Sequence, residues 1–293
     1  MNRVAAPLAA ALAAIALCAC GDGGAEPGAS NEATLVLDFQ PNAVHAGIYA
    51  AQASGAYAES GVALEIREPS ASTDAPKLLA AGRAEFAILD IHDLAIARDR
   101  ALIRAPADLE GRAVGVTGLP SDDAVLDSVL EAGGADPDAV DRITIGFEAV
   151  PQLSAGRLEA ATAFWNAEGV ALRRAGVDTR EFRVDDYGAP RYPELVLVTA
   201  DPRSPLADDV RAATAAGYEE VIADPDAGLD ALLAGANGLD EAEQRAQLEA
   251  LTAADAFSPA GEFDEGALRE WADWDLERGI VAEPIDVGAA FRP

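Results

Sequence analysis

Short apolar runs alternate with amphipathic stretches through the first third of the chain. Brief apolar runs predict buried strands, and apolar positions that recur every three to four residues predict helices. The pattern predicts strands at 35–38, 62–66 and 86–89 and helices at 44–53, 75–81 and 91–98. Strands that alternate with helices at this spacing indicate parallel βαβ units.

A second series of the same kind begins at Ala113. It predicts strands at 113–116, 143–145, 161–164 and 194–199 and helices at 122–132, 150–155 and 170–174. After Pro205 the pattern becomes helical, with helices expected at 208–223, 227–233, 241–251 and 265–278. Two α/β halves followed by a helical tail predict an α/β protein with two lobes and a cleft between them.

Residues 1–19 have the pattern of a secretory signal peptide, in which Arg3 precedes an Ala/Leu-rich run that ends in small residues. The run is shorter than the roughly 20 apolar residues of a membrane span. The segment Leu17-Cys-Ala-Cys20 resembles the lipobox of bacterial lipoproteins, with Cys20 as the lipidated residue, and an ordinary cleaved signal is the alternative. Residues 20–32 are then a flexible tether. We expect an exported protein that is anchored as a lipoprotein on the outer face of the cytoplasmic membrane.

Composition narrows the range of partners and activities. The chain has 21 Lys+Arg against 51 Asp+Glu, a formal net charge of −30, and Lys77 is its one lysine. Nucleic acids and anionic lipid surfaces are bound through cationic patches, so we expect neither as a partner. The scarcity of His, Cys and Met argues against a metal site, and we find neither a nucleophile elbow nor a nucleophilic cysteine. We therefore expect no enzyme, no catalytic residues and no cofactor.

The run Leu37-Asp-Phe-Gln-Pro-Asn-Ala-Val-His-Ala-Gly-Ile-Tyr-Ala-Ala51 carries a specific motif. It resembles the D-W-x-P-N-x-x-H-x-G-x-Y-x-A opening of the substrate-binding proteins of ABC importers for thiamine pyrimidine precursors. That family is similar in fold to the fungal thiamine pyrimidine synthase. Further segments that fit the family are 77–87, 91–95, 164–169 and 187–196.

The resemblance implies a type II periplasmic-binding-protein architecture, in which two α/β lobes close on a ligand by hinge motion. Lobe I is expected to comprise residues 33–108 and 196–293, and lobe II residues 109–195. The implied function is to capture a small heteroaromatic nutrient, a thiamine pyrimidine precursor, for delivery to a membrane permease. The alternatives are a receptor for another nutrient such as a sulfonate or nitrate, a pyridoxal-phosphate-dependent pyrimidine synthase, and a degenerate binder.

The chain departs from the family pattern in two places. Phe39 stands where the family has Trp, which keeps a stacking face but loses the indole N–H donor. After Arg100 the chain lacks a segment that forms the first crossing between the lobes in the family, so the stretch 101–107 is expected to carry that crossing.

The candidate ligand-binding residues fall within the resembling segments. Offset stacking on a flat heteroaromatic ring is expected from a set of aromatic residues: Phe39, Tyr49, Trp165, Tyr187 and Tyr192. Hydrogen bonds to such a ring and its amino group are expected from a polar set: Asn42, Asp90, His92, Asn166 and Glu168. The alternatives are that these aromatic residues, Tyr49 above all, belong to the core and that Asn166 caps the helix after it. A lone histidine is more often structural, which is the alternative for His92 and the role expected for His45 at a helix start.

The loop 115–123 joins a predicted strand to a predicted helix, a position that suits phosphate binding. It contains no Lys or Arg, and Asp122 and Asp123 stand at the start of the helix, where they would repel an anion. The loop therefore argues against a phosphorylated or sulfonated ligand.

Overall fold

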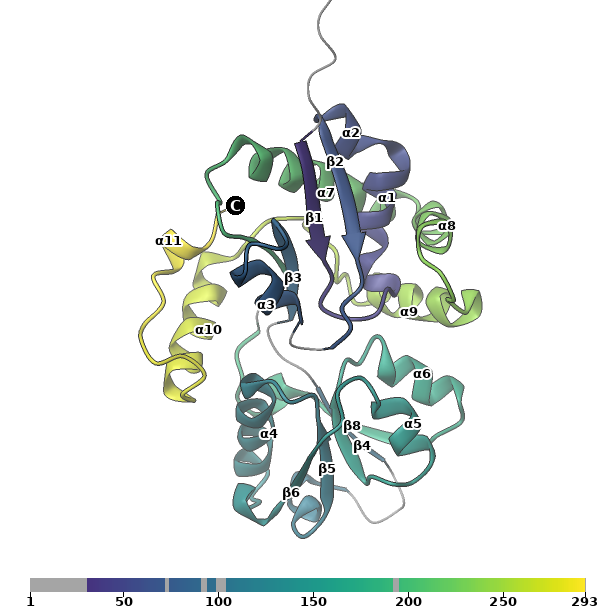
Figure 1. The fold of residues 1–293 in the computed structure, drawn as a ribbon. Coiled ribbons are helices and arrows are strands. Elements are labelled where there is room, and N and C mark those ends of the chain that lie inside the picture. Colours follow the sequence, from purple (N-terminus) through teal and green to yellow (C-terminus); the bar gives the residue numbers. More distant parts are fainter. Residues whose placement is uncertain (1–30, 72–73, 91–93, 99–103, 192–194, 293) are drawn as a thin grey trace, which may run out of the picture.

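A computed structural model describes residues 31–71, 74–90, 94–98, 104–191 and 195–292, and the chain forms two α/β lobes (Figure 1). Each lobe has its own sheet, with strand orders β2-β1-β3-β9 and β6-β5-β7-β4-β8. Within the described residues, no helix is both long enough and apolar enough to span a membrane.

Lobe I is built on the first sheet, in which β1 lies parallel to β2 and β3 while β9 is antiparallel to β3. Its strands are β1 (Asn31–Val36), β2 (Val62–Arg67), β3 (Phe86–Asp90) and β9 (Leu195–Thr199). One face packs on the helices α1 (Ala46–Ser54), α2 (Ala56–Glu59) and α7 (Pro205–Ala223), and the other on α3 (Asp74–Ala80). The first face buries Leu35, Ile48 and Val210 completely.

Helices α1 and α7 approach each other closely at two glycines. A Cβ atom on Gly217 would lie 2.0 Å from the carbonyl oxygen of Gly47, so no larger residue fits there. The side chain of Tyr218 covers Gly47 and donates a hydrogen bond to the Val44 carbonyl at 2.8 Å. This packing fixes the start of α1, and with it the loop that follows β1.

Lobe II is built on the second sheet, whose strands are β4 (Leu94–Arg98), β5 (Ala113–Val116), β6 (Asp141–Thr144), β7 (Ala160–Ala163) and β8 (Thr179–Phe182). Alternate residues of the central strand β7 face opposite sides of the sheet. Ala160 joins the core beneath α4 (Pro120–Ala132), and Ala161 and Ala163 join the core beneath α5 (Ala149–Ser154) and α6 (Glu168–Arg174). The short turns η2 (Pro106–Leu109), η3 (Pro137–Ala139) and η4 (Val184–Tyr187) pack against α4.

The sequence pattern predicts a helix over 91–98, and this prediction is wrong for residues 94–98. They form β4, which lies antiparallel between β7 and β8. Leu94 and Ile96 alternate with Ala95 and Ala97, a period of two that suits a strand in the middle of a sheet. Pairing on both sides overrides the helical preference of the alanines. Strand β8 is also absent from the elements that the pattern predicts.

The position of β4 corrects the predicted lobe boundary. Strand β3, which ends at Asp90, belongs to lobe I and β4, which begins at Leu94, belongs to lobe II, so the lobe boundary falls between these two residues and not after residue 108. The described residues of 94–108 therefore belong to lobe II, and the stretch 101–107 is not the crossing. The chain returns to lobe I before β9 begins at Leu195, next to the boundary expected at 195/196.

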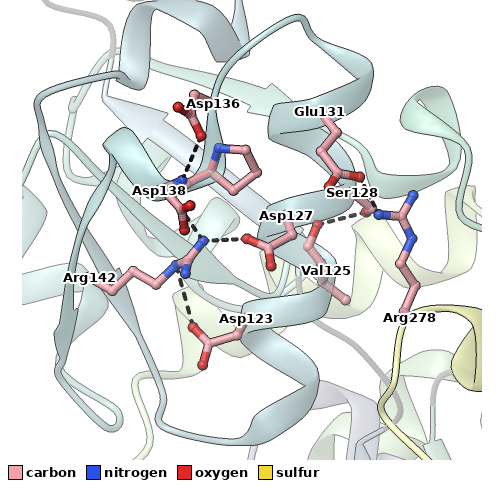
Figure 2. Close-up of polar contacts among 10 residues, drawn as sticks. Asp123, Val125, Asp127, Ser128, Glu131, Asp136, Asp138, Arg142 and Arg278 are labelled. Carbon is pink, nitrogen blue, oxygen red and sulfur yellow. Dashed lines mark hydrogen bonds and ion pairs between the residues drawn. The ribbon is translucent and has the colours of Figure 1, made fainter.

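The helices after β9 complete lobe I and reach lobe II. Helices α8 (Pro225–Gly235) and α9 (Glu241–Ala253) pack beside α1 and the turn η1 (Ala43–His45), and they are followed by α10 (Glu265–Glu277) and α11 (Val287–Ala290). Helix α10 packs against both lobes: Trp271 lies in a cluster with Val196 of β9, and Trp274 in a cluster with Val125 of α4. Figure 2 shows Arg278, just after α10, paired with Glu131 of α4, with 2.5 Å between Nη1 and Oε2.

Candidate functional site

A cavity of about 240 Å³ lies where the two lobes face each other. Lobe I contributes the loop after β1, the start of α3 and the end of β3, and lobe II contributes the loops after β5, β6 and β7. Carboxyl ends of parallel strands are where α/β proteins bind ligands. A second hollow, of about 480 Å³, lies on lobe II between α6 and β8, away from the facing edges of the lobes.

Three phenylalanines line the cavity and meet across the lobes. The ring of Phe39 of lobe I lies edge-on to the ring of Phe147 of lobe II, with 4.6 Å between centroids and 80° between planes. It lies edge-on also to Phe164, at 5.9 Å and 64°. Such edge contacts leave ring faces available to a flat ligand. The remaining apolar lining includes Leu89 and Leu119.

Asp38, beside Phe39 in the cavity lining, is held by a buried histidine. Nε2 of His45 lies 2.9 Å from Oδ1 of Asp38, and Nδ1 of His45 accepts a hydrogen bond from the backbone N–H of Asn42 at 3.2 Å. Because Nδ1 accepts, we assign the proton of the neutral ring to Nε2, which donates to the carboxylate. His45 is 0% exposed, which agrees with the structural role expected from the sequence. It fixes the carboxylate of Asp38 at the cavity.

Glu168, at the start of α6, is the second carboxyl group of the cavity. Its pKa is raised from 4.5 to about 7, chiefly through desolvation by burial and to a smaller extent through the nearby charge of Asp38. The Phe164 N–H donates to Oε2 at 3.1 Å, which acts in the opposite direction. Glu168 therefore changes charge near neutral pH inside a small apolar cavity, where a ligand with N–H donors would favour the ionised form.

The loop after β5 uses its own donors internally. The carboxylate of Asp122 accepts from the Thr117 N–H at 2.6 Å, from the Thr117 hydroxyl at 2.5 Å and from the Gly118 N–H at 3.2 Å. These donors are the kind that an anion at a helix N-terminus requires. No Lys or Arg stands among the described residues that line the cavity, so the cavity offers an anionic group little to bind.

Besides Asn166, four of the predicted site residues with described side chains lie outside the cavity lining. Asn42 is the N-cap of η1: its side chain accepts from the Val44 N–H and donates to the Gln40 carbonyl. Tyr49 is buried in a cluster with Leu232, as the core alternative expects. The other two are Trp165, which packs against the cluster formed by η1, α8 and α9, and Tyr187, which packs edge-on to Phe182 in the core of lobe II.

The structure tests the remaining predictions unevenly. Asn166 is buried, and the N-cap of α6 is Ala167 without a side-chain cap bond, so the alternative in which Asn166 caps the helix is wrong. Asp90 is the last residue of β3, and its side chain is not among the described ones. Cys20, His92 and Tyr192 lie outside the described residues. Of the ten predicted ligand-binding residues, the structure brings together Phe39 and Glu168 at the cavity.

Several lining residues are missing from the predicted site. Asp38 and Thr117 follow parallel strands, so the rule that placed Asp90 and His92 at the strand ends could have found them. Phe164 and Phe147 could have been found in the same way. Ile280 had no such signal, because it reaches the cavity from the segment after α10, far away in the sequence.

Lys77, the one lysine of the chain, lies close to this site. It is exposed on α3, directly after Pro76, which lines the cavity. Hydrogen bonds from Ser70 lower the pKa of Asp74, and the positive charge of Lys77 lowers it by a smaller amount. Lys77 itself is not among the residues that line the cavity.

The two lobes and the cavity between them define a substrate-binding protein with type II periplasmic-binding-protein architecture. Similar solved structures include the alkanesulfonate-binding protein SsuA from Xanthomonas axonopodis pv. citri, with a TM-score of 0.67, 14% identity and coverage of 89% of this chain and 99% of that chain. The aliphatic sulphonate-binding protein SsuA from Escherichia coli gives a TM-score of 0.62 at 13% identity, covering 90% and 92% of the two chains. At these identities the likeness establishes the fold alone.

Sequence comparison establishes the family. The family model described as NMT1/THI5 like matches residues 42–103 and 94–228, and the chain belongs to this family. It is 30% identical to the formylaminopyrimidine-binding protein of Halalkalibacterium halodurans, over 85% of this chain and 87% of the relative. The family resemblance seen in the sequence motifs is thereby confirmed.

Proposed function

We propose that this protein captures a small, uncharged or weakly cationic heteroaromatic, a thiamine pyrimidine precursor, between its lobes and delivers it to an ABC permease. The observation that carries the proposal is the composition of the cavity: three phenylalanines, two carboxyl groups and no cation among its described lining residues. The similarity to the formylaminopyrimidine-binding protein supports the same chemical class of ligand, a substituted pyrimidine. No bond is made or broken in this function.

The cavity volume supports a ligand of one ring. Protein interiors are filled to a density of about 0.75, so a cavity of about 240 Å³ accommodates about 180 Å³ of ligand atoms. That volume suits a pyrimidine with a short substituent and is too small for a second ring system. Ligand cavities of drug-sized molecules start at about 300 Å³.

The two carboxyl groups support an amino-substituted ring. An ionised carboxylate only accepts hydrogen bonds, so Glu168 and Asp38 can take the N–H donors of an exocyclic amine or of a protonated ring nitrogen. The imidazole of His45 already supplies one donor to Asp38, which leaves the second oxygen of that carboxylate for the ligand. The ring faces of Phe39, Phe147 and Phe164 supply the apolar contact.

The alternative ligands and the enzyme alternative fit these residues less well. A sulfonate or nitrate needs cations or free N–H donors, and the N–H groups of Thr117 and Gly118 bind Asp122 instead. Pyridoxal phosphate needs a lysine for its Schiff base and a site for its phosphate. Lys77 is exposed and outside the cavity lining, so the described residues do not fit that cofactor.

Export and anchoring belong to the same proposal. Residues 1–19 would direct export, Cys20 would carry the lipid, and the residues between Cys20 and Asn31 would link the anchor to lobe I. Because β1 begins at Asn31, the linker ends two residues earlier than the 20–32 expected from the sequence. A two-lobed binder tethered in this way remains close to its permease. The sequence pattern of the N-terminus supports this part of the proposal.

Isothermal calorimetry on the purified protein tests the ligand class. The panel contains formylaminopyrimidine, an aminopyrimidine without the formyl group, thiamine and an alkanesulfonate. We expect Glu168→Gln to weaken binding of the preferred pyrimidine by about 1.5–3 kcal/mol, the scale of a hydrogen bond to a charged group. The exposed Glu219 of α7 supplies the matched control, Glu219→Gln. Tight binding of the sulfonate, or pyrimidine binding that is indifferent to Glu168, would contradict the proposal.

A further inference from the structure

Thr162 occupies an unusual position in the cavity wall. It lies in the central strand β7, where its neighbours Ala161 and Ala163 face the core beneath α5 and α6. Strand alternation turns Thr162 to the opposite side of the sheet, toward α4. The residue is 2% exposed and belongs to the cavity lining.

The hydroxyl group of Thr162 has no hydrogen-bond partner among the residues that the structure describes, and water does not reach it. A buried hydroxyl left without a partner lowers stability, and most such groups in proteins are paired. An alanine would complete the all-alanine pattern of β7, and a valine would keep the shape of the side chain, in both cases without this loss. No hydrogen bond to another described residue fixes the direction of the O–H bond, which can turn about the Cβ–Oγ1 axis toward an acceptor.

Of the other polar side chains that line the cavity, Ser121 carries a hydroxyl at the start of α4, and the remaining ones leave a role for a further donor. The carboxylate of Asp38 accepts hydrogen bonds, and so does that of Glu168 when ionised. The hydroxyl of Thr117 already donates to Asp122. A pyrimidine carries ring nitrogens that accept hydrogen bonds, and a formyl group carries an accepting oxygen, so a ligand of this class needs a donor as well as acceptors.

We propose that Thr162 is a specificity-determining residue whose hydroxyl donates a hydrogen bond to an acceptor atom of the bound heteroaromatic. This inference rests on the proposed function and adds the donor that the two carboxylates lack. Thr162 and Glu168 then recognise opposite features of the ligand, an acceptor and a donor. A ring that lacks either feature would be bound more weakly.

The test uses three variants of the full exported chain: Thr162→Val, Thr162→Ser and, as the matched control in the same lobe, Thr144→Val on the edge strand β6. The melting temperature is measured without ligand, and formylaminopyrimidine affinity is measured by calorimetry. For Thr162→Val we expect an unchanged or higher melting temperature, by about 2–4 °C, and affinity lower by about 3- to 10-fold. Thr162→Ser retains the hydroxyl and should bind within about 2-fold of the wild type.

Two results would overturn the inference alone. One is that Thr162→Val binds formylaminopyrimidine with the same affinity as the wild type. The other is a melting temperature for Thr162→Val clearly below that of Thr144→Val, which would show that the hydroxyl has a structural partner. Failure of the wild-type protein to bind any aminopyrimidine would overturn the proposed function and, with it, the role of Thr162.

Discussion

Burial of Glu168 makes the stability of the unliganded protein depend on pH in a way that a single substitution should remove. The carboxyl group has a pKa of about 7 in the folded protein, against 4.5 as the ordinary value, chiefly because burial removes its solvent. Between these two values the folded chain keeps a proton that the unfolded chain loses. Its contribution to stability is therefore fully present below pH 4.5 and is lost as the pH rises through 7.

The size of the effect follows from the displacement of the pKa. From 4.5 to about 7 is a change of about 2.5 pH units, and each unit corresponds to 1.36 kcal/mol, so the loss is about 3 kcal/mol. Glutamine in the same place cannot ionise. We therefore expect Glu168→Gln to match the wild type near pH 5 and to exceed its unfolding free energy by up to about 3 kcal/mol at pH 8.

Urea denaturation followed by circular dichroism, at pH 5 and pH 8, measures the difference. The exposed variant Glu219→Gln should follow the wild type at both values, since it removes a carboxylate that already lies in solvent. If the wild type and Glu168→Gln keep the same difference in unfolding free energy at pH 5 and pH 8, Glu168 does not hold a proton in the folded state. The proposed charge change in the cavity would then be wrong.

Three further predictions concern the anchor, the support of Asp38 and the cavity wall. Cys20→Ala should move the protein from the membrane to the soluble exported fraction on fractionation, and persistent membrane attachment would refute the lipobox. His45→Leu should lower the unfolding free energy by about 2–4 kcal/mol in urea denaturation, because it leaves Asp38 and the backbone N–H of Asn42 without their His45 partner. If the unfolding free energy falls by less than it does for a substitution at an exposed position, His45 does not hold Asp38 in place. Ile280→Ala should enlarge the cavity and shift the affinity ratio toward thiamine by about tenfold in calorimetry. The exposed Ile222→Ala is its control, and an unchanged ratio would remove Ile280 from the wall.

Most helices and strands could be predicted from the sequence because the apolar residues of each one follow a single periodicity, either that of a helix or that of a strand. The strand at 113–116 has the predicted bounds, and the helix predicted at 241–251 is extended only to Ala253. The strand β4 could not be found in this way, since Leu-Ala-Ile-Ala-Arg fits a helix or a strand equally well until its neighbours β7 and β8 are known. The lobe boundary was displaced for the same reason.

The site was harder to predict than the fold. The motif around Asn42 and Tyr49 does reach the cavity, but through Asp38 and Phe39, whereas Asn42 caps a turn and Tyr49 packs beneath α8. Sequence position brings a residue near a cleft, and the direction of its side chain decides whether it enters. Ile280 shows the opposite case, because a distant segment folds into the wall.

The single lysine has a practical consequence for the study of binding. Lys77 is the one side-chain amine of the sequence, and it is exposed directly after a residue of the cavity wall. Amine-reactive dyes would therefore label one side chain, beside the cavity wall, where closure of the lobes on a ligand would change the surroundings of the dye. For the same reason, immobilisation through lysine would turn the cleft toward the sensor surface and hinder ligand entry. Coupling at Lys77 would therefore give a fluorescent reporter of binding when a dye is attached, and a protein that binds ligand poorly when a surface is attached.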